Sequence, residues 1–192
     1  NANQIGYFPV IEGFTYAELN NLQSFKDATD DDTIAILIEP VQGEGGVWPC
    51  DPEFVKGLRE WCDEKDMLLL FDEIQTGWGR TGKLMAFMHY DVKPDILSMA
   101  KGMGGGMPIG AIVTSEKLGK TFNMGSHGST FGGHPVCCAA AYAAVQEIVD
   151  KKLSENAEEV GAYFREKAKE LPHVKDIRGM GLLNGIEFDI NI

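Results

Sequence analysis

Four short apolar runs, separated by polar segments, organise the earlier part of the chain. They are Ile34–Pro40, Met67–Glu73, Asp95–Lys101 and Ile109–Ser115. A continuous apolar run of this length is typical of a strand covered on both faces, whereas a half-exposed strand alternates apolar and polar residues. The pattern therefore predicts four strands, most of them buried.

Helical patterns lie between and after these runs. Asp51 followed by Pro52 is typical of a helix start, and apolar residues recur at helical spacing after it. Two longer helices are expected over residues 135–149 and 156–171. A capping-box pattern at Thr15–Glu18 predicts a further short helix near the beginning of the chain.

The alternation of strands and helices predicts an α/β fold, with a mostly parallel sheet and helices on both of its faces. Residues 177–188 are expected to be extended, with glycine kinks. The polar turn at residues 150–156 is a candidate domain boundary. On this interpretation residues 1–150 form part of a large domain, and residues 151–192 form a linker helix and the start of a small α+β C-terminal domain.

Composition narrows the possible functions. The formal net charge of −12 argues against a nucleic-acid partner, which needs a basic stripe on the protein. The longest wholly apolar run, Met67–Phe71, is too short to cross a bilayer, so no membrane partner is expected. The four cysteines form no C-x-x-C pair, which favours a reducing compartment such as the cytoplasm. The chain starts without methionine, so we expect a piece of a longer protein or a processed start.

Three of the apolar runs contain or end in an ionisable residue: Glu39, Asp72 and Lys101. In open α/β sheets the ligand crevice lies outside the carboxyl ends of the strands. The glycines of segment 102–106, directly after the lysine, would let a ligand approach the backbone closely. A pyridoxal 5'-phosphate (PLP) site needs a lysine that forms a Schiff base and a carboxylate that keeps the pyridine nitrogen protonated. Asp72 and Lys101 fit these two roles, although each alone could be a surface residue where a strand emerges.

A second pattern suggests a different class of function. Residues 77–83 spell G-x-x-x-x-G-K, the phosphate loop of nucleotide hydrolases. That loop needs a hydroxyl residue next to hold magnesium, and here the next residue is Leu84. A nucleotide-binding module therefore stays as the alternative of a different class, and Lys83 is interpreted as a solvated loop lysine.

Five segments in order resemble the class III PLP-dependent aminotransferases. They are EPVQGEGG (39–46), FDEIQTGWGRTGK (71–83), PDILSMAKGMGGGMPIGA (94–111), GSHGSTFGGHP (125–135) and IRGMGLLNGIE (177–187). The resemblance extends from about Gly13 to Phe188. It implies a truncated fold-type I PLP-transferase large domain, followed by the start of the small C-terminal domain.

The resemblance also implies roles at the cofactor ring. Lys101 matches the lysine that bonds to PLP and then moves the proton, and Asp72 matches the acid beneath the pyridine nitrogen. Ile74 matches the residue that packs on one ring face, although it could simply be core. Gln75 matches the amide that contacts the ring hydroxyl.

Other roles implied by the resemblance lie further from the ring. Ser129 and Thr130 match the hydroxyl pair that reaches the cofactor phosphate from the neighbouring subunit, which implies a homodimer with active sites at its interface; Ser129 could also be only a turn residue. Glu44 matches the acid that pairs with an arginine and swings aside when a 2-oxo acid binds. Glu39 is expected to be structural and bonded to nearby backbone. None of the four histidines has metal-ligand spacing with a partner, so no metal is expected.

The implied activity is transfer of the distal amine of N-acetylornithine to 2-oxoglutarate, a step of arginine biosynthesis. Ornithine, succinylornithine and 4-aminobutyrate stay open as alternative amine donors. The family's main phosphate loop, the aromatic residue on the other ring face and the substrate arginine match no segment of this chain. The chain alone is therefore expected to be inactive, with Asp72 and Lys101 near one edge of an incomplete sheet.

Overall fold

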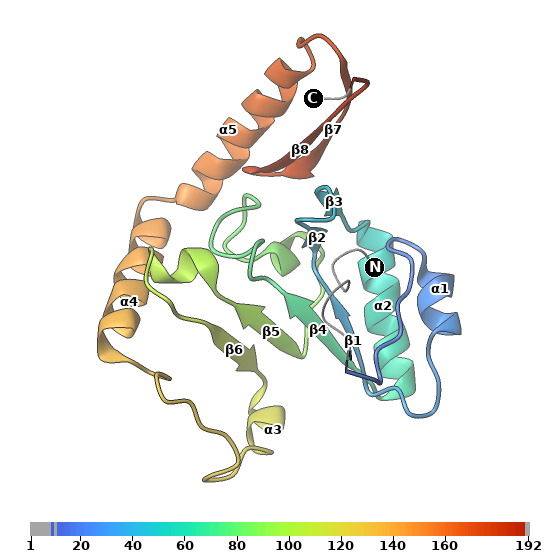
Figure 1. Ribbon diagram of the computed structural model, residues 1–192, viewed down its shortest axis with the longest axis vertical. Helices are drawn as coiled ribbons and strands as arrows, with labels where there is room; N and C mark the ends of the chain where they lie inside the picture. Colours follow the sequence, from blue (N-terminus) through green and yellow to red (C-terminus); the bar gives the residue numbers. More distant parts are fainter. Residues whose placement is uncertain (1–8, 10, 191–192) are drawn as a thin grey trace.

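The computed structural model describes residue 9 and residues 11–190, and its helices and strands follow one another as Figure 1 labels them. The helices are α1 (Leu22–Asp27), α2 (Pro52–Lys65), α3 (Glu116–Gly119), α4 (Pro135–Asp150) and α5 (Leu153–Ala168), with 3-10 turns η2 (Ala86–His89) and η3 (Lys101–Gly104). The strands are β1 (Ala35–Ile38), β2 (Val41–Gln42), β3 (Trp48–Pro49), β4 (Leu68–Asp72), β5 (Ile96–Met99), β6 (Ala111–Thr114), β7 (Val174–Met180) and β8 (Leu183–Phe188).

A four-stranded sheet in the order β1-β4-β5-β6 forms the centre of the fold. Strands β1, β4 and β5 run parallel, and β6 runs antiparallel to β5. All four predicted apolar runs are strands of this sheet, so the expected α/β class with a mostly parallel sheet is confirmed. The register places Ile38, Phe71 and Leu97 side by side on one face of the sheet.

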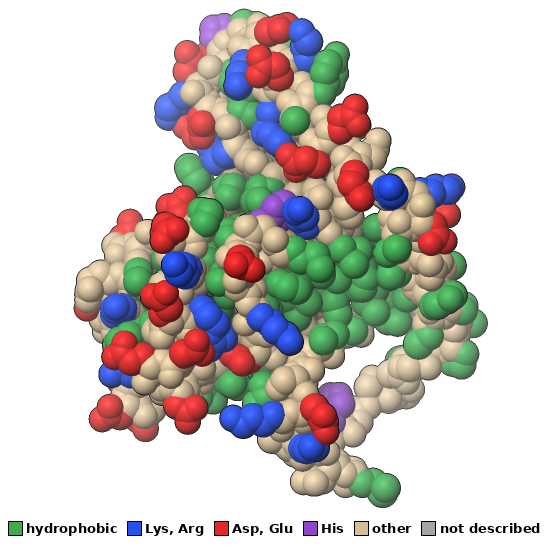
Figure 2. Space-filling view, turned by 180° about the vertical axis from the view of Figure 1, so that it is seen from behind, with side chains coloured by type: hydrophobic (Ala, Val, Ile, Leu, Met, Phe, Trp, Pro, Cys, Tyr) green, Lys and Arg blue, Asp and Glu red, His purple; other side chains and the backbone are tan. Residues whose placement is uncertain are grey.

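Helix α2 covers that face and closes the main core. It begins at Pro52, as predicted, and buries Val55 and Leu58 completely against the sheet. The opposite face is more open in the described residues, because Leu37 is 58% exposed and Ile112 is 72% exposed. In the view from behind, hydrophobic side chains gather across the middle of the molecule (Figure 2).

The last part of the described chain consists of α5 and the β7–β8 hairpin, which Figure 1 shows at one end of the molecule. Helix α5 packs directly on the hairpin turn, since a Cβ added at Gly161 would lie 1.8 Å from the carbonyl oxygen of Gly181. Residues 177–188, predicted to be extended, belong to this antiparallel hairpin. The β7–β8 sheet is distinct from the four-stranded sheet, whereas the predicted domain division after residue 150 stays a prediction.

The helix predicted near the start of the chain begins later than expected. Helix α1 starts at Leu22, because the side chain of Asn21 accepts a hydrogen bond from Ser24 N at 3.1 Å and caps the helix. Thr15 instead donates its hydroxyl to Ala28 O, so the capping-box prediction at Thr15 was wrong. Helix α5 also begins and ends three residues earlier than the predicted range 156–171. None of the helices in the described residues is long and apolar enough to cross a membrane.

Candidate active site

Asp72 and Lys101 follow the two inner strands of the central sheet. Asp72 is the last residue of β4 and lies beside Ser98 of β5, while Lys101 comes three residues after Ser98. The expectation that this pair lies near an edge of the sheet was wrong, because the outer strands are β1 and β6. Both residues nevertheless lie at the carboxyl ends of parallel strands, where α/β proteins bind their ligands.

The Asp72 carboxylate is half-buried and only partly engaged. Its Oδ1 accepts a hydrogen bond from Ile74 N at 2.9 Å. No residue in the described part of the chain bonds to Oδ2. One oxygen therefore holds the carboxylate in place while the other stays available to a ligand.

Lys101 is exposed and has an unusual backbone. Its φ of +44° lies in the left-handed region. A residue other than glycine in this conformation costs about 1–3 kcal/mol, and such residues cluster at ligand sites. Lys101 opens turn η3, and Gly105, the residue directly after that turn, lies in the same left-handed region. Across residue 9 and residues 11–190, Nζ of Lys101 makes no hydrogen bond or ion pair, so the amine is free.

The Glu39 carboxyl group interacts electrostatically with both Asp72 and Lys101. Its Oε2 accepts a hydrogen bond from Gly43 N at 3.2 Å, which confirms the expectation that Glu39 bonds to nearby backbone. Burial raises the pKa of this carboxyl; the Gly43 N–H and Lys101 oppose that shift, and the negative charges of Asp72 and Glu44 add to it. Asp72, Lys101 and Glu44 thus lie within electrostatic range of one half-buried carboxyl group.

Gln75 and Glu44 come together at the hairpin of β2 and β3. The side-chain amide of Gln75 lies directly against Gly43, since a Cβ at that position would be 2.3 Å from Gln75 Oε1. Glu44 follows at once and is exposed in the loop between the two strands. The fold therefore places both near Asp72, although their predicted contacts with cofactor and substrate stay predictions.

Ile74 is half-buried in the turn after β4, where its N–H orients the Asp72 carboxylate. The structure gives it this backbone role, and its predicted packing on a ring face stays a prediction.

Ser129 and Thr130 are not brought to Asp72 and Lys101. Both are exposed in the segment between α3 and α4. That segment leaves from the carboxyl end of β6, which is antiparallel, so it starts at the opposite end of the sheet (Figure 1). Within this chain the two hydroxyl groups lie away from the candidate site, and a role there needs a second copy of the chain.

Glu73, next to Asp72, is a residue that the sequence prediction missed. It is completely buried and accepts hydrogen bonds from Ala86 N at 2.6 Å and Phe87 N at 2.8 Å, with the Thr76 hydroxyl at 3.3 Å. Burial raises the pKa of its carboxyl, and the two backbone N–H groups oppose that shift. Glu73 thereby holds together the two ends of the segment from residue 73 to residue 87, which begins at the candidate site. The sequence signal that could have identified it is an acidic residue within an apolar run.

The glycine-lysine pattern at residues 77–83 does not form a phosphate loop. The segment consists of turns and leads to the 3-10 turn η2, whereas a phosphate loop opens an α-helix whose N-terminus faces the anion. The carboxylate of Glu158 fills the space at Gly82, where an added Cβ would be 2.3 Å from Glu158 Oε2. An acid in this position would repel a phosphate, so the structure argues against the nucleotide-binding alternative.

The described residues at the site fit PLP. The free amine of Lys101 can bond to an aldehyde, and the unengaged Oδ2 of Asp72 can accept a hydrogen bond from a protonated ring nitrogen. Among residue 9 and residues 11–190, no three or more His, Cys, Asp or Glu side chains cluster in a way that could hold a metal ion.

Comparisons with known proteins agree on one family. The family model for class III aminotransferases matches residues 10–191. The acetylornithine aminotransferase of Methanocaldococcus jannaschii is 45% identical over 98% of this chain and 48% of its own length. That of Aquifex aeolicus is 48% identical over 96% of this chain and 48% of its own length. The chain spans about half the length of the curated relatives it matches.

Solved structures give the same result for the fold. Ornithine aminotransferase from Toxoplasma gondii, in a structure with partial occupancy of PLP at the active site, matches with a TM-score of 0.91 and 40% identity over 96% of this chain and 45% of its own. Acetylornithine aminotransferase from Elizabethkingia anophelis matches with a TM-score of 0.87 and 39% identity over 93% of this chain and 46% of its own.

Proposed function

This chain belongs to the class III aminotransferases, and from that premise we propose that the whole protein uses PLP to transfer the distal amine of N-acetylornithine to 2-oxoglutarate. By the whole protein we mean a chain of the relatives' length that contains these 192 residues. The observation that carries the proposal is the free amine of Lys101 beyond the end of β5, with the half-engaged carboxylate of Asp72 on the neighbouring strand.

The described residues would divide the work as follows. PLP, when bound, supplies an electron sink for bonds broken next to the substrate nitrogen. Lys101 would hold the cofactor covalently and, once its amine is released, would move a proton between the two carbon atoms on either side of the transferred nitrogen, one in the substrate and one in the cofactor. Asp72, oriented by Ile74 N, holds the proton on the pyridine nitrogen through Oδ2. Gln75, seated against Gly43, contacts the ring hydroxyl, and the Ile74 side chain packs on the ring.

Substrate exchange and the cofactor phosphate involve residues at the margin of the site. Glu44, in the exposed β2–β3 loop, alternates between pairing with a substrate-binding arginine and leaving it free for a 2-oxo acid. Ser129 and Thr130 serve the phosphate of a neighbouring subunit in a homodimer, which accounts for their distance from Lys101 within one chain. The cytoplasm is the proposed location, as for a pathway enzyme acting on small soluble substrates.

The amine donor is the least constrained part of the proposal. Curated relatives at 43–48% identity are acetylornithine aminotransferases, which favours N-acetylornithine. Ornithine is the second candidate, because ornithine aminotransferase structures match with TM-scores up to 0.91. Succinylornithine and 4-aminobutyrate are further donors of the same chemical kind.

The 192-residue chain alone should not turn over substrate. It lacks a described phosphate cradle near Lys101, and its hydroxyl pair lies away from the site. Positioning of reactants accounts for roughly 7–11 kcal/mol of an enzymatic barrier. Robust glutamate formation by this chain with PLP, N-acetylornithine and 2-oxoglutarate would contradict the division of roles given above.

A donor panel tests the proposal. The whole protein, saturated with PLP, is assayed for glutamate formation from 2-oxoglutarate with each of the four candidate amines. The largest kcat/KM is expected for N-acetylornithine. A larger value for ornithine would move the assignment to the second candidate, and no turnover with any donor would refute the proposed function. Magnesium-dependent ATP binding would support the nucleotide alternative.

A further inference from the structure

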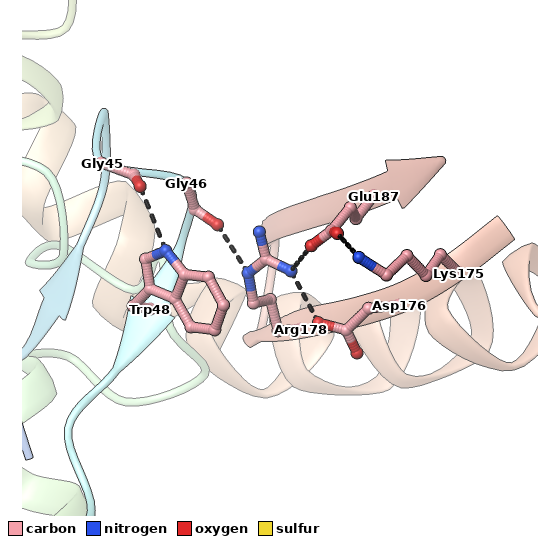
Figure 3. Close-up of polar contacts among 7 residues, drawn as sticks. All are labelled: Gly45, Gly46, Trp48, Lys175, Asp176, Arg178 and Glu187. Atoms are coloured by element: carbon pink, nitrogen blue, oxygen red, sulfur yellow. Dashed lines mark hydrogen bonds and ion pairs between the residues drawn. The ribbon is translucent and has the colours of Figure 1, made fainter. Parts of the chain in front are cut away.

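Arg178 of the C-terminal hairpin binds the loop between β2 and β3, the loop that also contains Glu44; Figure 3 shows its contacts with Gly46 and Trp48. Arg178 belongs to β7, and its guanidinium carbon lies 3.7 Å from the ring centre of Trp48 in β3. Its Nε also donates a hydrogen bond of 2.8 Å to Gly46 O, across 132 positions of sequence. A stacked cation that is also a directed donor fixes both the distance and the orientation of the loop.

The guanidinium group is itself held rigidly from the hairpin side. Nη1 donates to Asp176 Oδ2 at 2.6 Å and to Glu187 Oε2 at 3.1 Å, and the side chain is only 16% exposed. Glu187 is also paired with Lys175, and these partners lower the pKa of the Glu187 carboxyl. Ion pairs on one side and the aromatic ring on the other leave the guanidinium little freedom.

The loop takes its shape from this contact. Trp48 Nε1 donates to Gly45 O at 3.1 Å, and Gly46 has a φ of +115° that a residue with a side chain rarely adopts. A Cβ at Gly46 would lie 3.0 Å from Trp48 Nε1 and 3.4 Å from Arg178 Nη2. Gly185 of β8, the cross-strand partner of Arg178, packs closely against the same loop, since a Cβ at this position would lie 3.0 Å from Gly46 O.

Glu44 lies two residues before the gripped carbonyl. Its own side chain is exposed, and no described residue holds its carboxylate in a hydrogen bond or ion pair. The direction of that carboxylate therefore depends on the backbone of the loop, which is anchored at Gly43 by Glu39 and at Gly46 by Arg178.

We propose that Arg178 is a positioning residue that sets Glu44 through Gly46, and so couples the C-terminal hairpin to the choice between the amine donor and the 2-oxo acid. This inference rests on the proposed function. If the loop loses its anchor, Glu44 pairs less well with its arginine when the amine donor binds. Glutamate, whose carboxylates need that arginine free, then reacts relatively better.

The experiment compares three variants of the whole protein. Arg178→Lys keeps the positive charge but cannot stack flat on Trp48 and donate to Gly46 O at the same time. Gly185→Ala leaves the arginine intact and presses a methyl group on Gly46 O and on Val47. The matched control is Lys175→Ala, which removes the ion pair between the exposed Lys175 and Glu187 while Arg178 keeps its contacts with Trp48, Gly46 O, Asp176 and Glu187.

The measured quantity is the kcat/KM for the preferred amine donor divided by the kcat/KM for glutamate. This ratio is independent of the fraction of folded enzyme, so a general loss of stability does not change it. The ratio is expected to fall at least about tenfold in Arg178→Lys and in Gly185→Ala, and to stay within about twofold in Lys175→Ala. Equal losses for both substrates would show a purely structural role and overturn the proposal.

Hydrogen exchange gives a readout that needs neither cofactor nor turnover. Amides of residues 43–48 should exchange at least about fivefold faster in Arg178→Lys than in the unmodified protein, and at an unchanged rate in Lys175→Ala. Unchanged exchange in Arg178→Lys would overturn the anchoring step. If the unmodified protein transaminates no amine at all, the proposed function fails instead, and the exchange result still decides whether Arg178 anchors the loop.

Discussion

Replacing Glu73 by Gln tests how the turn beside Asp72 is held. The carboxylate accepts hydrogen bonds from Ala86 N and Phe87 N in a completely buried place. A Gln side chain offers one oxygen acceptor and turns an NH₂ group toward the second backbone N–H. A buried donor left without an acceptor costs about 1–3 kcal/mol, so we expect a loss of about 2 kcal/mol in the free energy of unfolding.

Glu73→Ala should cost more than Glu73→Gln, because both N–H groups then lose their acceptor and a cavity forms. Urea unfolding followed by circular dichroism measures each loss. The control is Glu64→Gln, an exposed acid of α2, for which a change within about 0.5 kcal/mol is expected. Equal stability of Glu73→Gln and the unmodified protein would refute the account of this loop.

The pH dependence of this difference has a defined sign. The pKa of Glu73 is raised in the folded state, mainly by burial, so its contribution to stability is complete below the unfolded pKa of about 4.3. It is lost as the pH rises through the higher folded pKa. The stability gap between the unmodified protein and Glu73→Gln should therefore narrow as the pH is raised, and a gap that widens would contradict the burial of this carboxyl.

Three further predictions address single side chains. Asp72→Asn should slow single-turnover transamination by about 100-fold or more while PLP affinity changes far less, because an amide fills the space but does not hold the ring proton; near-normal rates would exclude that role. Glu44→Ala should lower the amine-donor to glutamate ratio of kcat/KM at least as much as Arg178→Lys does, and an unchanged ratio would remove Glu44 from substrate choice. Burial lowers the pKa of His89, as does Lys83, while Thr81 O and Glu158 oppose the shift. Its contribution to stability should thus be present above the unfolded pKa of about 6.5 and lost as the pH falls through the lower folded pKa, so that a His89→Gln profile parallel to that of the unmodified protein would be the contrary result.

The strands of the central sheet, and the two site residues at their ends, could be predicted from the sequence. Continuous apolar runs predicted β1, β4, β5 and β6, because a run of this length bounded by polar turns is typical of a strand. The rule that ligands bind at the carboxyl ends of parallel strands then selected Asp72 and Lys101. The order of strands was not accessible, so the pair was placed near an edge although both residues follow inner strands.

Contacts between distant segments were not predictable. Nothing local to Arg178 indicates that its Nε reaches Gly46 O, because the contact depends on how α5 and the hairpin sit against the β2–β3 loop. The burial of Glu73 likewise depends on a turn that brings Ala86 back to it after 13 residues. The helix cap is Asn21 and not the predicted Thr15, because the Asn21 side chain accepts the hydrogen bond from Ser24 N. Both residue types are favoured as helix caps, so the sequence pattern alone does not decide between them.

The central claim is that Lys101 carries the cofactor, and borohydride reduction tests it most directly. The whole protein is incubated with PLP, reduced, digested and mapped by mass spectrometry, with Lys83 of the glycine-rich turn as the internal comparison. The account predicts stable labelling of Lys101 and loss of that label in Lys101→Arg, with Lys83 unlabelled. Labelling of Lys83, or labelling that persists elsewhere at full stoichiometry in Lys101→Arg, would contradict it.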